Sequence, residues 1–131
     1  MKILDSDHCV ALLRGQLSLA GRVEPQEELG ITAVSAGELA HGAAKSKHYA
    51  ENLARLDVLL SALVVLPFDE FAARRFGLIK AQLEMQGQRL SDLDLQIASI
   101  ALEAHSPLVT HNRAHFERLV EGAGLVIEDW L

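Results

Sequence analysis

MKILDSDHCVALLRG, residues 1–15, changes character within a few positions. Lys2, Ile3 and Leu4 are typical of a short buried strand. Two acids, Asp5 and Asp7, follow directly, and apolar residues then return at helical spacing. A carboxylate beside a buried strand is costly to desolvate unless a cation or hydrogen-bond donors compensate it. The stretch therefore predicts a strand that runs into a helix, with an acid pair in need of a partner at the junction.

The alternation of strand and helix continues along the chain. Further strands are predicted over residues 31–34, 63–66, 107–110 and 125–127. Helices are predicted from residue 35 and over residues 47–63, 69–86, 91–105 and 115–119, and a short helix is compatible with 16–20. Connections of this length are crossovers between parallel strands. We therefore predict a single domain over residues 1–131, a three-layer α/β/α fold with a mostly parallel central sheet.

Composition limits the class of protein. The chain has 131 residues, half of them hydrophobic, which suits one domain with its own core. Its single cysteine, Cys9, cannot form an internal disulfide, and no apolar run is long enough to cross a bilayer. We expect a cytoplasmic protein without a membrane segment. The net charge of −6 argues against a broad basic face for nucleic acid but is compatible with a small acidic metal site.

Several polar residues follow the predicted strands. In an open parallel sheet, ligands bind beyond the carboxyl ends of the strands. Asp5 with Asp7, Glu38 and Asn112 would meet at this edge. Asp94 would join them if its helix packs with its amino end at the same edge. Oxygen ligands of this kind suit Mg²⁺ or Mn²⁺, so the pattern favours a cation site.

Helix capping is the competing interpretation of the same residues. Ser35 with Glu38, and Ser91 with Asp94, both fit a capping box, in which the acid returns to the start of its helix. The remaining acids and Asn112 are common N-cap residues. Caps do not require acids to follow several strands at one sheet edge. The convergence, rather than any single residue, therefore favours the cation site.

The histidines offer a second kind of metal site. His111 and His115 are four residues apart, a spacing that can place two imidazoles on one helix face. His111 is expected to precede its helix, however, and no HExxH pattern is present. We therefore expect no zinc site here, and we expect the other histidines, including His8, to be packing or surface residues.

The order of these segments resembles the PIN domain and, within it, the VapC-type toxin ribonucleases of bacterial toxin–antitoxin pairs. The resemblance extends over nearly the whole chain, and no one segment would carry it alone. It rests on four stretches: LDSDHCVALLRG, TAVSAGELAHGAAKS, VLPFDEFAARRFGLIKAQLEMQGQRLSDLDLQIASIAL and LVTHNRAHFERLVEGAGLVIEDWL.

The resemblance implies roles for individual residues. Carried over position by position, it makes Asp5, Glu38, Asp94 and Asn112 the catalytic residues. The three acids would hold one Mg²⁺ or Mn²⁺, which would activate a water for hydrolysis of an RNA phosphodiester bond. Asn112 would position water or substrate. His115 stands where the family often has an acid. The fourth position of the site, formed by Asn112 and His115, therefore supplies no negative charge.

The resemblance also implies partners. The protein would be an endoribonuclease acting on tRNA or mRNA, held inactive by a VapB-like antitoxin, and it would form a homodimer. The lack of negative charge at the fourth position, Asn112 and His115, motivates an alternative, a non-catalytic PIN-like interaction module. The apolar helix face from Tyr49 to Leu63 would either contact one of these partners or belong to the core.

Overall fold

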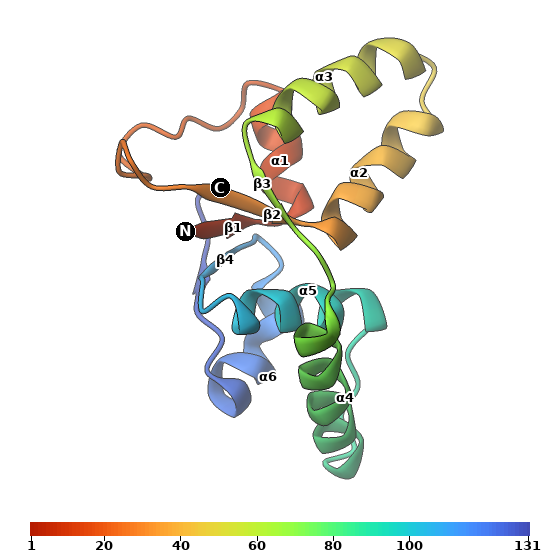
Figure 1. Cartoon of the computed structure of the whole chain (residues 1–131), viewed down its shortest axis with the longest axis vertical. Coiled ribbons are helices and arrows are strands. Elements are labelled where there is room, and N and C mark those ends of the chain that lie inside the picture. The colour runs from red at the N-terminus through yellow and green to blue at the C-terminus, as the bar shows by residue number, and fades with distance from the viewer.

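The computed structural model describes residues 1–131 and contains one five-stranded sheet (Figure 1). All strand pairs are parallel, and the order in the sheet is β3-β2-β1-β4-β5. The strands are β1 (Lys2–Leu4), β2 (Leu29–Thr32), β3 (Val64–Leu66), β4 (Leu108–Val109) and β5 (Ile127–Glu128). Because β1 is the central strand, the residue that follows it, Asp5, lies between the ends of β2 and β4.

Six helices cover the two faces of this sheet, which confirms the three-layer prediction. One layer consists of α1, α2 and α3, and the opposite layer of α4, α5 and α6 (Figure 1). The helices are α1 (Ser6–Leu13), α2 (Ala33–Ala44), α3 (Tyr49–Ser61), α4 (Glu70–Met85), α5 (Asp92–Glu103) and α6 (Arg113–Ala123). None of them is long and apolar enough to span a membrane.

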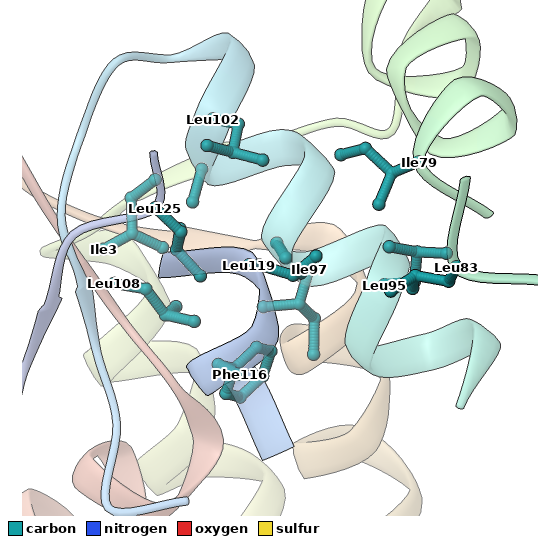
Figure 2. Close-up of a cluster of buried hydrophobic side chains, with 12 residues drawn as sticks. Ile3, Ile79, Leu83, Leu95, Ile97, Leu102, Leu108, Phe116, Leu119 and Leu125 are labelled. Carbon is teal, nitrogen blue, oxygen red and sulfur yellow. The ribbon is translucent and has the colours of Figure 1, made fainter. Parts of the chain in front are cut away.

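Side chains of the central strands point alternately to the two faces of the sheet and contribute to the core on each face. Ile3 of β1 and Leu108 of β4 belong to the cluster that α4, α5 and α6 complete, which Figure 2 shows. Their chain neighbours Leu4 and Val109 belong to the second cluster, on the side of α1, α2 and α3. Successive side chains of a strand point to opposite faces, so two short strands can supply both cores.

The start of α2 differs from the prediction. β2 covers Leu29–Thr32 rather than residues 31–34, and α2 begins at Ala33. Thr32 is the N-cap, and its Oγ1 accepts the backbone N–H of Ser35 at 3.0 Å. The capping box from Ser35 to Glu38 was therefore wrong, because Thr32 is itself a good cap and ends the strand in an extended conformation.

Other boundaries also differ. Residues 16–20 form no helix, α6 begins at Arg113 rather than at residue 115, and the last strand begins at Ile127 rather than at residue 125. The cap predicted at Ser91 is confirmed, since its hydroxyl accepts the backbone N–H of Asp94 at 3.2 Å.

The apolar face of α3 belongs largely to the core. Leu56 is buried, and Leu60 and Leu63 pack against the second cluster. Tyr49, at the start of the helix, is half exposed. Of the two interpretations of this face, packing within the chain therefore describes Leu56, Leu60 and Leu63.

Candidate active site

Asp5 is buried, with 4% of its surface exposed, and every polar contact it makes comes from a neutral donor. Its Oδ1 accepts the backbone N–H of Ser6 at 2.9 Å and the hydroxyl of Ser35 at 3.3 Å. Its Oδ2 accepts the hydroxyl of Thr110 at 2.8 Å. The Thr32 hydroxyl donates in turn to Ser35 Oγ at 3.2 Å. Residues that follow three neighbouring strands thus meet at one carboxylate.

These donors do not compensate the burial of Asp5. Burial raises the pKa of its carboxyl group above the ordinary value, and the nearby charge of Asp7 raises it further, although three hydrogen bonds lower it. No Lys or Arg forms an ion pair with Asp5. A buried acid that lacks a cationic partner within its own chain is the feature expected of a ligand for an external cation.

Glu38 and Asp94 approach Asp5 from two helices. Partial burial raises the pKa of Glu38, and the charges of Asp5 and Asp94 raise it further, so Glu38 lies close enough to both acids to be repelled by them. Asp94 lies in the first turn of α5, and its charge acts on Glu38 together with that of Asp5, so the amino end of this helix lies near the carboxyl edge of the sheet. Its Oδ2 lies 3.1 Å from Nδ1 of His115 on α6.

The acids suit a hard divalent cation in charge and ligand type. As the side chains stand, no three carboxylate, imidazole or thiol groups lie close enough together to coordinate one ion. Glu38 is exposed, so its side chain can turn toward Asp5. Oδ2 of Asp5 accepts one strong hydrogen bond and keeps a free lone pair. Carboxylate oxygens and water are the ligands that Mg²⁺ and Mn²⁺ prefer.

Asn112 lies at the rim of this group of acids. It is exposed, it is the N-cap of α6, and its side chain forms no capping hydrogen bond. Its backbone N–H donates to Thr110 Oγ1 at 3.1 Å, which places it one hydrogen bond away from the hydroxyl that holds Asp5. The structure thus brings Asp5, Glu38 and Asp94 together, with Asn112 beside them.

Asp7 has a different role from Asp5. Its Oδ1 accepts Nδ1–H of His8 at 2.7 Å, and its Oδ2 accepts the backbone N–H of His111 at 2.9 Å. Partial burial opposes ionisation, but the bonds from His8 and His111 prevail and lower the pKa of Asp7. Asp7 is therefore a fully engaged structural acid that holds the loop after β4.

His8 was expected to be a packing or surface residue, and its hydrogen bonds were not foreseen. Its side chain is fully buried, and its Nε2 accepts the backbone N–H of Trp130 at 3.0 Å. The partner lies at the other end of the chain, so no local pattern could reveal it. A charged neighbour at Asp7 is the one signal in the sequence that favours a hydrogen-bonded imidazole over a packed one.

The other reactive groups do not form a competing site. His111 Nδ1 lies 2.8 Å from Asp129, whereas His115 Nδ1 lies 3.1 Å from Asp94, so the two imidazoles contact different carboxylates. Burial raises the pKa of the Cys9 thiol to about 12, so it is not a nucleophile at neutral pH.

Comparison with known proteins agrees with this fold. The PIN domain family matches residues 2–121. The tRNA(fMet)-specific endonuclease VapC of Shigella flexneri is 34% identical over 130 residues, which is 98% of this chain and 96% of that protein. The structure of DNA-bound VapBC from Salmonella typhimurium matches with a TM-score of 0.88 at 31% identity, over the whole of both chains. VapBC2 of Rickettsia felis, bound to a DNA fragment from its promoter, gives 0.88 at 27% identity, over 99% of this chain and 98% of that one.

The chain belongs to the PIN domain family. Similarity over its full length places it, within that family, among the VapC proteins.

Proposed function

We propose that this protein is an endoribonuclease toxin of the VapC type, which hydrolyses RNA phosphodiester bonds with Mg²⁺ or Mn²⁺. The observation that carries the proposal is the buried Asp5, whose pKa is raised, which pairs with no cation, and whose charge acts on Glu38 together with that of Asp94. Relatives named ribonuclease or tRNA(fMet)-specific endonuclease support RNA, tRNA included, as the substrate.

Asp5, Glu38 and Asp94 would hold the cation. When bound, it would lower the pKa of a water molecule and neutralise charge that develops on the phosphate. Thr110 and Ser35 hold the Asp5 carboxylate in place through their hydroxyls, so this ligand is oriented before any ion arrives. Asn112, exposed at the rim, would orient water or the substrate.

The same family likeness supports the partners. Solved relatives are VapBC toxin–antitoxin complexes, and we propose that a cognate VapB-like antitoxin holds this protein inactive. We further propose that it works as a homodimer in the cytoplasm, where its RNA substrates are found. The exposed apolar side chains Phe71, Leu78 and Met85, spaced by seven on α4, are available for such contacts.

A cleavage assay tests the proposed function. Purified protein is incubated with total RNA in the presence of Mg²⁺, Mn²⁺ or a chelator, and the cut ends are mapped. The intact chain is compared with Asp94→Asn and with Asp92→Asn, which changes an exposed neighbour on α5 that pairs with Lys80. We expect cation-dependent cleavage, a loss of about 10²-fold or more in Asp94→Asn, and none in Asp92→Asn.

Three results would refute the proposal. Cleavage that continues in the chelator excludes the cation, and full activity of a folded Asp94→Asn excludes the acid site. A stable antitoxin complex with no cleavage of any RNA would instead identify a non-catalytic interaction module.

A further inference from the structure

A cavity of about 620 Å³ lies between α1, α2 and α3. Figure 1 shows α1 within the angle that α2 and α3 form. Ser6, which follows Asp5, and Glu38 line the cavity, so it opens beside the acids of the active site. Arg14, at the end of α1, and Arg55, on α3, line it as well. The cavity therefore joins two basic side chains to the acidic site, and we call it the α1–α3 groove.

The two arginines of the α1–α3 groove have no acidic partner. Both are exposed and neither forms an ion pair, whereas Arg75 on α4 pairs with Glu103 at 2.8 Å. The neighbouring stretch, residues 39–50, contains two lysines and two histidines but no acid. In a chain with a net charge of −6, this is a local surplus of positive charge next to the acids.

We propose that the α1–α3 groove binds the phosphodiester backbone of the RNA substrate, with Arg14 and Arg55 contacting phosphates next to the one that is cleaved. This inference rests on the proposed function and adds the path of the substrate. A guanidinium group binds phosphate oxygens in a bidentate manner, and it remains charged at any physiological pH.

Electrostatics explain why the groove is needed. An acidic protein repels RNA, and the three acids of the site repel it most strongly at the point where it must be cleaved. Unpaired cationic groups that line the same groove as Glu38 offset that repulsion and align the strand. An arginine that already pairs with an acid, as Arg74 does with Glu70, attracts phosphate less strongly because the acid offsets its charge. The unpaired state of Arg14 and Arg55 is therefore what favours a phosphate chain as the occupant.

Salt-dependent RNA binding tests the groove. The affinity of the purified full chain for a short fluorescent single-stranded RNA is measured by anisotropy in a chelator, from about 50 to 200 mM salt. We compare wild type with Arg14→Ala/Arg55→Ala, Arg14→Lys/Arg55→Lys and the control Arg74→Ala. The alanine pair should bind several-fold more weakly, and its slope of log affinity against log salt should be shallower by about 0.7 for each lost phosphate contact. The lysine pair should retain the slope, and Arg74→Ala should match wild type.

The outcomes separate this inference from the proposed function. If the wild type cleaves RNA and the alanine pair has the wild-type slope and affinity, the inference that the groove binds RNA is wrong and the proposed nuclease function stands. If the wild type and the variants bind RNA with the expected slopes but the wild type never cleaves it, the proposed nuclease function is wrong and RNA binding in the groove is supported. An alanine pair that keeps its RNA affinity and loses only its affinity for the antitoxin also overturns the inference, because the groove then binds protein.

Discussion

Nε2 of His8 accepts the backbone N–H of Trp130 at 3.0 Å, although the two residues are 122 positions apart. Because Nε2 accepts, the proton of the neutral imidazole is on Nδ1, which donates to Asp7 at 2.7 Å. The ring also meets the Trp130 indole edge to face, with centroids 6.0 Å apart. The end of the chain is thereby hydrogen-bonded to α1, the helix that Asp5 caps.

Replacing His8 should destabilise the protein while leaving Asp5, Glu38 and Asp94 unchanged. His8→Leu leaves the buried N–H of Trp130 without an acceptor and removes a donor from Asp7, which should lower the free energy of unfolding by about 1–3 kcal/mol. Urea unfolding followed by circular dichroism measures this. The control His48→Leu alters a largely exposed histidine and should change little. Equal unfolding midpoints for His8→Leu and wild type would disprove the role of this hydrogen bond.

Loss of the Thr110 hydroxyl should weaken the folded state when Asp5 is ionised. Thr110→Val keeps the side-chain shape but removes the 2.8 Å bond to Asp5, and a hydrogen bond to a charged group contributes about 1.5–3 kcal/mol. Thr110→Ser keeps a hydroxyl and should unfold nearly as wild type does. The measurement is urea unfolding at neutral and at acid pH, with the larger difference expected at neutral pH. A valine variant equally destabilised at both would argue against a contact with the carboxylate.

The raised pKa values predict how a cation acts on stability. A carboxyl group whose folded pKa is above its ordinary value binds protons more tightly when folded, so its ionisation destabilises the folded state as pH rises above that value. In a chelator, Asp5→Asn should therefore melt at a higher temperature than wild type at pH 7. Mn²⁺ should raise the melting temperature of wild type, more at pH 7 than in acid, and should have little effect on Asp5→Asn. Thermal unfolding with and without Mn²⁺ decides this, and equal stabilisation of both proteins would show that Asp5 is not a ligand.

Asp7 should show the opposite pH dependence. Its pKa is lowered, so its stabilising contribution is present above the ordinary value of 3.8 and is lost as the pH falls through the folded value. Asp7→Asn should be less stable than wild type at neutral pH, and the difference should shrink in strong acid. Unfolding measured across this range tests it. A difference that grows toward acid would mean that the bonds from His8 and His111 do not favour the charged form.

His115 offers a way to strengthen the proposed cation site. Its Nδ1 lies 3.1 Å from Asp94, and His115→Glu would add a carboxylate beside the existing acids. We expect about tenfold tighter Mn²⁺ binding by titration calorimetry, since oxygen ligands and negative charge both favour the ion. His48→Glu, which changes the N-cap of α3 and not a residue of the proposed cation site, is the control. Unchanged affinity in His115→Glu would place the ion elsewhere.

Short-range patterns were sufficient for most elements of the fold. The strand residues Ile3 and Leu4, the cap at Ser91 and the crossover-length connections predict a parallel sheet between two helical layers, and the structure agrees. The start of α2 was misplaced because Thr32 suits both the end of a strand and a helix cap, and local propensity does not separate the two.

The sequence by itself determined which acids follow which strands, because chain order and strand direction are local properties. Only the tertiary structure decided that Asp94 reaches the same edge as Asp5, because that depends on how α5 packs on the sheet. It also separated Asp5 from Asp7, two acids that look equivalent in the sequence. Asp5 is enclosed by neutral donors, whereas Asp7 is held by His8 and the loop after β4, and those partners come from distant parts of the chain.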